Sequence, residues 1–225
     1  MPEQYQPEIG RVIRPKAKAR SNYDRLSRWY DWLAGSGEWK LTEVGLRQLD
    51  VREGQTALEI GPGTGRGLSA LAQAVGNSGR VCGLDLSSGM LEVARARIQK
   101  AGLAARVSLV QGDAASLPFR TGSFDAVFMS FTLELFDAPE IPVVLAECRR
   151  ALRPGGRLGV VALSREGGRS LARVLYEWAH AALPSLVDCR PIFVRRALEE
   201  AGFAILDQTR ATMWGLPVEL VLTSN

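Results

Sequence analysis

The fold is decided by the stretch Ala57-Leu58-Glu59-Ile60-Gly61-Pro62-Gly63-Thr64-Gly65. It begins as a short apolar run that carries one acid, Glu59, and it continues as a glycine-rich turn. From Arg66 onward the residues have the spacing of a helix. Glycines let a backbone turn tightly and approach a ligand closely, and the helix that follows presents free N–H groups. Strand, glycine turn and helix together predict a site for a nucleotide-like ligand.

Glu59 indicates which ligand of that kind the turn binds. A pyrophosphate carries negative charges, which a carboxylate beside it would repel. S-adenosylmethionine has no phosphate, and an acid stabilises its positive sulfonium and ammonium groups. The glycines also miss the dinucleotide pattern G-x-G-x-x-G, because Arg66 stands at the third glycine position when the count starts at Gly61. The stretch therefore favours a methyl-donor site over a dinucleotide site.

The composition is that of one soluble α/β domain. The chain has 225 residues, of which 46% are hydrophobic, and its mean hydropathy is −0.01. No apolar run is long enough to span a bilayer, and the first residues lack the order of a signal peptide. Cys82, Cys148 and Cys189 are too few and too scattered for a disulfide framework or a metal site. We therefore expect a cytoplasmic protein with reduced thiols and no bound metal.

Positive charge is concentrated in two segments of a chain whose net charge is +4. One segment is residues 11–28, and the other comprises Arg149, Arg150, Arg153 and Arg157 around a predicted helix end. Such clusters attract anionic membranes, nucleic acids or acidic substrates. They also occur as solvated arms and as ordinary charges at helix ends. We favour the second interpretation, because no aromatic-rich nucleic-acid motif accompanies the charges.

The rest of the chain alternates between strand and helix patterns. Residues 1–20 are expected to form a flexible basic arm, and residues 21–50 are expected to be helical, with a break at Ser36 and Gly37 before a helix near 38–50. Predicted strands lie near residues 56–61, 80–85, 106–111, 124–130, 157–163, 203–210 and 217–223. Predicted helices lie near residues 66–75, 87–102, 139–152 and 189–201.

This alternation predicts an α/β fold with a doubly wound, Rossmann-like sheet, because continuously apolar strands are covered on both faces. The last two strands are joined by Met213-Trp214-Gly215-Leu216, which leaves no room for a crossover helix, so they must be antiparallel. We expect residues 21–225 to form a single domain. Its expected parts are a helical lid at 21–50, a cofactor-binding core at 55–163, an acceptor lid at 164–190, and a C-terminal helix and hairpin at 191–225.

Polar residues stand at the ends of successive predicted strands, where ligands of such sheets bind. Asp85 lies about 20 residues beyond the glycine turn, where an acid can accept both ribose hydroxyls. Asp113 can accept from an adenine amine, Met90 can cover an adenine face, and Ser130 is expected close to the methyl group. Each aspartate alone is more often a helix cap. Together they predict an adenosine-containing ligand.

Five segments carry a family resemblance, and they are residues 58–65, 83–91, 112–119, 123–127 and 152–158. In this order and spacing they resemble the class I S-adenosylmethionine-dependent methyltransferases, and among them the group that includes the ubiquinone- and menaquinone-biosynthesis C-methyltransferases. The resemblance implies a seven-stranded sheet of order 3-2-1-4-5-7-6 with strand 7 antiparallel. It implies that Glu59 and the glycines hold the methionine end of the donor, Asp85 the ribose and Asp113 the adenine. The expected cofactor-binding residues are Glu59, Gly61, Gly63, Gly65, Asp85, Leu86, Met90, Gly112, Asp113, Ala114 and Ser130.

Catalytic residues are less well indicated. A general base is needed only if the acceptor arrives protonated, and the candidates are Tyr30, His180 and Glu134. For His180 we favour a packed or surface histidine. Ser130-Phe131-Thr132-Leu133 lacks the Asp/Asn-Pro-Pro-aromatic motif of enzymes that methylate base amines, which argues against that reaction.

The acceptor is expected to be a small, hydrophobic or aromatic molecule, since most of the tryptophans fall in the two expected lids. Three alternatives stay open: methylation of phospholipid amines at an anionic membrane surface, an RNA-binding or RNA-modifying protein, and a non-catalytic binder of an adenosine ligand. Nucleic acid is the less favoured partner. The sequence does not predict an oligomeric state.

Overall fold

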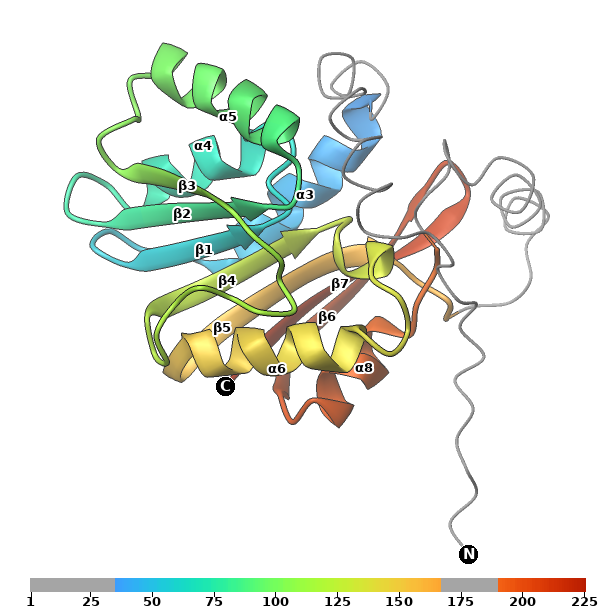
Figure 1. Ribbon diagram of the computed structural model, residues 1–225. Helices are drawn as coiled ribbons and strands as arrows, with labels where there is room; N and C mark the ends of the chain where they lie inside the picture. Colours follow the sequence, from blue (N-terminus) through green and yellow to red (C-terminus); the bar gives the residue numbers. More distant parts are fainter. Residues whose placement is uncertain (1–34, 167–189) are drawn as a thin grey trace, which may run out of the picture.

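The computed structural model describes residues 35–166 and 190–225 as a seven-stranded sheet with helices on both faces (Figure 1). The strand order is β3-β2-β1-β4-β5-β7-β6, which confirms the order expected from the sequence. The strands are β1 (Thr56–Ile60), β2 (Arg80–Asp85), β3 (Val107–Gln111), β4 (Phe124–Ser130), β5 (Leu152–Leu163), β6 (Ala204–Met213) and β7 (Leu216–Ser224). The helices are α3 (Gly35–Leu49), α4 (Arg66–Ala74), α5 (Ser88–Lys100), the 3-10 turn η1 (Leu133–Leu135), α6 (Ile141–Ala151) and α8 (Val194–Glu200).

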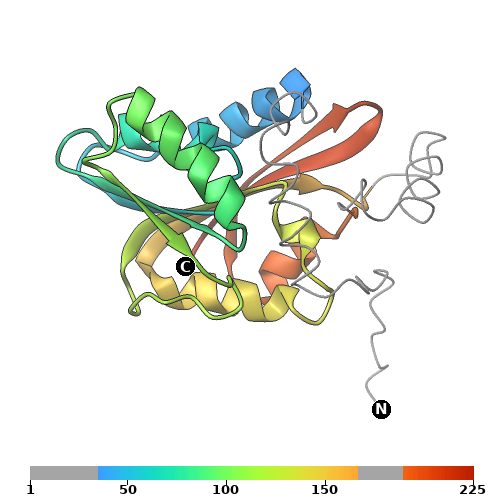
Figure 2. The same ribbon diagram turned by 45° about the horizontal axis from the view of Figure 1, so that its top comes forward.

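Two hydrophobic layers enclose the sheet. In both views α3, α4 and α5 lie on one face, and α6 and α8 lie on the other (Figures 1 and 2). Leu68 of α4 and Phe128 of β4 belong to the first layer, and Leu145 of α6 and Leu198 of α8 belong to the second; all four are fully buried. The strands are therefore apolar on both sides, which is why they read as continuous apolar runs.

Strand direction brings the predicted site residues to one edge. β1 pairs in parallel with β2 and β4, so the carboxyl ends of these three strands meet at the same edge of the sheet. β7 is antiparallel to both β5 and β6, as the short connection predicted. Trp214 and Gly215 form that connection with φ values of 51° and 78°. Two consecutive residues with positive φ are typical of a tight two-residue hairpin turn.

Two boundaries differ from those expected. The break predicted at Ser36 and Gly37 is wrong, because α3 already begins at Gly35 and includes both residues. The helix packs on β6 and β7, and this tertiary packing outweighs the low helix propensity of Gly37. β5 begins at Leu152 instead of 157, because Leu152 pairs with Phe124 before an irregularity in the ladder.

None of the helices in residues 35–166 and 190–225 is long and apolar enough to cross a membrane.

Candidate functional site

The glycine turn after β1 is held against its neighbours by close contacts. Gly61, Gly63 and Gly65 have φ values of +66°, +52° and +82°, which side chains rarely adopt. The Gly61 N–H donates to the Leu84 carbonyl at 2.8 Å, which ties the turn to β2. A Cβ on Gly61 would lie 2.6 Å from the Thr132 side chain, and a Cβ on Gly65 would lie 2.9 Å from Ala94 Cβ. These two glycines are required by the packing of the protein itself.

Gly63 is different, because a Cβ there would meet no atom of residues 35–166 and 190–225 within 4 Å. Its positive φ therefore serves no packing contact within that part of the chain. The turn thus presents an open stretch of backbone, of the kind that approaches a ligand closely.

Asp85 and Asp113 lie at the same edge and share a local geometry. Asp85 Oδ1 accepts the Ser87 N–H at 2.8 Å, and Asp113 Oδ1 accepts the Ala115 N–H at 2.9 Å. Both side chains are half-buried. Ser87 in turn caps α5 through a hydrogen bond from the Met90 N–H. These turns fix the orientation of each carboxylate while leaving it partly exposed at the carboxyl edge.

The remaining predicted donor residues surround these two acids. The Gly112 N–H donates to the Asp85 carbonyl at 3.0 Å, which joins the ends of β3 and β2. Leu86 is half-buried beside Asp85, whereas Met90 and Ala114 are buried in the hydrophobic core. The structure therefore brings all of the predicted strand-end residues to one edge, with Met90 and Ala114 behind them.

Glu59 lies beneath the turn and not on the exposed edge. Its side chain is 3% exposed, and its Oε1 is so close to α4 that a Cβ on Gly67 would lie 2.0 Å from it. Oε2 is buried without a hydrogen-bond partner in the part of the chain that the structure describes. Burial, with a smaller contribution from Asp85, raises the pKa of Glu59 from 4.5 to about 8. A positively charged ligand nearby would stabilise the ionised form.

Replacing Glu59 by glutamine is expected to change how stability depends on pH. Between pH 4.5 and about 8 the folded protein keeps a proton that the unfolded chain has lost, so the free energy of unfolding falls as pH rises. The glutamine variant lacks this contribution. Its stability relative to wild type should therefore rise with pH, by up to about 1.4 kcal/mol per pH unit. Urea unfolding of both proteins across this range measures the difference, and a difference that is independent of pH would contradict a buried Glu59 carboxyl.

The end of β4 forms the other side of the site. Ser130 Oγ lies 2.7 Å from Thr42 Oγ1 of α3, and Thr132 Oγ1 donates to the Ser130 carbonyl at 2.9 Å. Thr132 also reaches back to the Gly61 carbonyl at 3.5 Å. Phe131 between them has a φ of 49°, a conformation that is strained for an aromatic residue. The sequence predicted Ser130 but not Thr42 or Thr132, because neither belongs to a recognisable motif.

Of the three candidate bases, Glu134 lies in η1 and is completely buried. Tyr30 and His180 lie outside the described residues, as do Cys189, the expected basic arm and most of the expected acceptor lid. Cys82 and Cys148 are buried free thiols.

Comparison with known proteins identifies the family. A family model described as "Methyltransferase domain" matches residues 57–156. The demethylmenaquinone methyltransferase of Anoxybacillus flavithermus is 33% identical over 174 residues, which cover 77% of this chain and 71% of that protein. The chain belongs to the class I S-adenosylmethionine-dependent methyltransferases. Its relatives in that family place it in the menaquinone-type group.

Two further comparisons agree with this assignment. The demethylmenaquinone methyltransferase of Geobacillus kaustophilus is 36% identical over 152 residues, which cover 68% of this chain; less than two thirds of that protein, 62%, has a counterpart here. The solved structure of 1,6-didemethyltoxoflavin-N1-methyltransferase from Burkholderia thailandensis has a TM-score of 0.72 and 19% sequence identity. The match covers 99% of this chain and 97% of that one, and S-adenosylhomocysteine is bound there. This likeness shows a shared fold.

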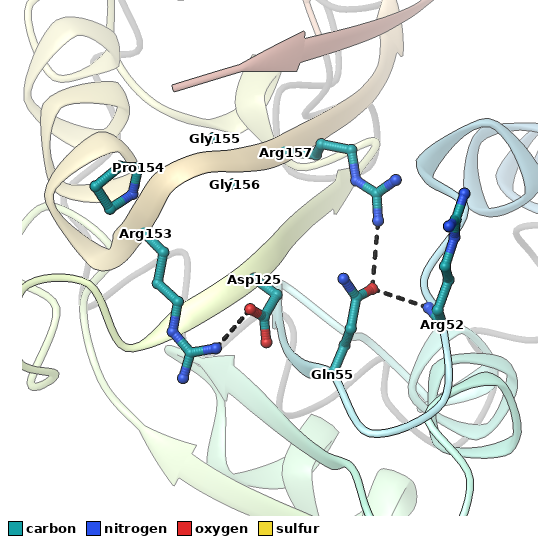
Figure 3. A pocket seen from close by; sticks show the side chains of 8 residues that line it. All are labelled: Arg52, Gln55, Asp125, Arg153, Pro154, Gly155, Gly156 and Arg157. Atoms are coloured by element: carbon teal, nitrogen blue, oxygen red, sulfur yellow. Dashed lines mark hydrogen bonds and ion pairs between the residues drawn. The ribbon is translucent and has the colours of Figure 1, made fainter.

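A hollow of about 340 Å³ lies at the opposite edge of the methyltransferase sheet, where β1, β4 and β5 begin (Figure 3). Figure 3 shows Arg153 directed toward Asp125 and Arg157 toward Gln55. The Arg153–Asp125 distance is 2.5 Å, and Asp125 also accepts the Thr56 N–H at 2.8 Å. These interactions join the amino ends of the strands, so the hollow is part of the scaffold and lies away from the glycine turn.

The second basic segment is bound into this scaffold. Each of its arginines makes hydrogen bonds to other parts of the methyltransferase, which supports their interpretation as structural charges. Arg149, Arg150, Arg153 and Arg157 donate, in that order, to Asn225, Glu147, Asp125 and the Asp50 carbonyl.

Proposed function

We propose that this protein transfers the methyl group of S-adenosylmethionine to a small, apolar or aromatic molecule. The observation that carries the proposal is the open backbone at Gly63 beside two oriented carboxylates, Asp85 and Asp113, which follow the next two strands at the same edge of the sheet. Family membership and the names of the relatives, which act as demethylmenaquinone methyltransferases, support it. A quinol or phenol is therefore the first acceptor class to consider.

The residues present fit the donor. The glycine turn would hold its methionine end, Asp85 its ribose hydroxyls, and Asp113 with Ala114 its adenine. Oε2 of Glu59 is buried beneath the turn without a hydrogen-bond partner among the described residues, and positive charge on the donor would stabilise its ionised form. When bound, the donor supplies an electrophilic methyl group on a positively charged sulfur.

The protein contributes position and exclusion of water, which dominate the catalysis of a displacement at a methyl group. Thr132 and Ser130 connect the turn to α3 through hydrogen bonds, so the end of β4 is fixed relative to the donor. We assign Ser130 to the point where the methyl group and the acceptor would meet. Leu133 and Glu134, three and four residues later, are fully buried, which supports a site closed to water on this side.

An acceptor screen with methyl-labelled S-adenosylmethionine tests the proposal. The panel contains quinols, phenols, amines, phosphatidylethanolamine vesicles and RNA, so that the lipid and RNA alternatives are measured in the same experiment. We expect label in an extractable quinol or phenol product. Label that appears only in the lipid or only in the RNA would contradict the proposed acceptor class, and no transfer to any acceptor would contradict methyl transfer itself.

A further inference from the structure

A second group of polar side chains lies on the acceptor side of the glycine turn, and Ser130 is its one member among the expected donor-binding residues. It consists of Glu38 and Thr42 on α3, Ser130 at the end of β4, and Glu134 in η1. Thr42 Oγ1 donates to the Glu38 carbonyl at 2.9 Å and lies 2.7 Å from Ser130 Oγ. The contact between Thr42 and Ser130 fixes α3 against the end of β4.

Glu134 has one satisfied and one unsatisfied oxygen. The residue is 0% exposed, and its Oε1 accepts the Leu163 N–H at 3.1 Å. Its Oε2 is buried and has no hydrogen-bond partner among residues 35–166 and 190–225. A buried carboxyl oxygen without a partner is costly unless it binds a proton or a ligand. The end of β5 thus fixes the position of Oε1, whereas Oε2 remains able to accept a proton.

Glu38 is the charged neighbour of Glu134 across the gap between α3 and η1. Burial raises the pKa of Glu38 to about 7, and burial together with the Glu38 charge raises the pKa of Glu134 to about 8. The other charged groups near η1, Asp137 and Arg190, pair with each other at 4.0 Å. Near neutral pH burial therefore favours the protonated form of each glutamate, and the charge of Glu38 adds to this effect at Glu134.

This pair lies next to the methyl end of the donor site. Thr132 connects the Gly61 carbonyl of the turn to Ser130, and Ser130 connects to Thr42 on the helix that carries Glu38. Glu134 follows Thr132 by two residues. Asp85 and Asp113, in contrast, follow β2 and β3 on the far side of the turn.

We propose that Glu134 is a catalytic residue that accepts the proton lost by the methyl acceptor, with Glu38 as its positioning residue. The inference rests on the proposed methyl transfer. It assigns the acceptor to a class: an uncharged molecule with an ionisable O–H or C–H bond, such as a phenol or a quinol. An anionic acceptor would be repelled by the two carboxyl groups.

The step is balanced in atoms and charge. The bond between sulfur and the methyl carbon breaks, and its electron pair stays on sulfur. A new bond forms between that carbon and the oxygen or carbon of the acceptor, and the acceptor proton moves to Glu134 Oε2. One positive sulfonium and one negative carboxylate are thereby neutralised together, so the step leaves the net charge of the site unchanged.

Glu219 on β7 provides a matched control. It is 1% exposed, its Oε1 accepts from Gln208 Nε2 at 2.7 Å, and its Oε2 is also buried without a partner in the described part of the chain. It faces Ala162 of β5 in the ladder, and none of the hydrogen bonds described for the glycine turn reaches it. Glu219 thus resembles Glu134 in burial but differs in place.

The experiment compares wild type with Glu134→Gln, Glu38→Gln and Glu219→Gln, using 1,4-naphthoquinol and labelled donor. Glutamine can still accept the Leu163 N–H, so the fold should persist. In the wild type, kcat should rise with pH as Glu134 loses its proton. We expect Glu134→Gln to lower kcat by about 100-fold or more and to remove this rise. Affinity for S-adenosylhomocysteine, measured by calorimetry, should stay within about twofold of wild type. Glu38→Gln should move the rise of kcat to lower pH, and Glu219→Gln should change none of these quantities.

The stability of the variant as a function of pH gives a second measurement, which does not depend on turnover. The stability of Glu134→Gln relative to wild type should rise as pH increases toward 8, because the folded wild type holds its extra proton in this range. Two results would overturn the role of Glu134 and leave the proposed methyl transfer standing. One is a Glu134→Gln variant that is as active as an active wild type. The other is a variant that loses S-adenosylhomocysteine binding in parallel with kcat. A wild type that methylates neither 1,4-naphthoquinol nor any phenol of the acceptor screen would overturn the proposed acceptor class and this inference together.

Discussion

Replacing Gly63 by alanine is expected to weaken the binding of S-adenosylmethionine by about 100-fold or more, which corresponds to about 2.7 kcal/mol. The new Cβ meets no atom within 4 Å in the part of the chain that the structure describes. The open space beside Gly63 is the space that we assign to the donor, so the methyl group should collide with the ligand only. Calorimetric titration with the donor measures the loss of affinity.

Gly102→Ala is the matched control for this variant. Gly102 follows α5 with a φ of +70°, and a Cβ there also meets nothing within 4 Å. Both alanines therefore incur a similar backbone strain, about 1 kcal/mol. We expect a similar fall in melting temperature for the two variants and a loss of donor binding only for Gly63→Ala. Equal donor affinities would show that the ligand does not lie against Gly63.

Replacing Asp85 by asparagine is expected to weaken donor binding by about 10- to 100-fold. A hydrogen bond to a charged group is worth about 1.5–3 kcal/mol, and the proposed ribose contact loses its charge in this variant. The amide oxygen can still accept the Ser87 N–H, which Asp85 Oδ1 accepts at 2.8 Å, so the turn before α5 should be preserved.

Asp125→Asn separates this effect from a general loss of structure. Asp125 also accepts a backbone N–H, that of Thr56 at 2.8 Å, but it stands at the amino ends of the strands. The Asp125→Asn variant should be somewhat less stable, because it loses the ion pair with Arg153, and it should keep its affinity for the donor. Donor affinity that falls equally in both variants would contradict the assignment of Asp85 to the ribose.

Much of this architecture could be predicted from local sequence. Continuous apolar strands, their alternation with helices, and the short connection at residues 213–216 predict a doubly wound sheet with an antiparallel end, whereas the strand order came from the family resemblance. Once the strands are placed, Asp85, Asp113 and Ser130 must meet at one edge, because parallel strands end together. These inferences need only the pattern along the chain.

The acceptor side could not be predicted in the same way. Thr42 and Ser130 are separated by 88 positions in the sequence, and nothing in the pattern of α3 marks Glu38 or Thr42 as neighbours of β4. The burial of Glu59 under α4 was also not predicted, since it depends on how closely Gly67 approaches β1. The extension of α3 through Gly37 depends on packing against the hairpin, which helix propensity does not describe.

The most direct test of the central claim is a calorimetric titration of the wild-type protein with S-adenosylmethionine and, separately, with a nicotinamide dinucleotide. The account predicts that one S-adenosylmethionine binds per chain and that the dinucleotide does not bind, because Arg66 stands where the dinucleotide pattern requires its third glycine. Binding of the dinucleotide without binding of S-adenosylmethionine would contradict it.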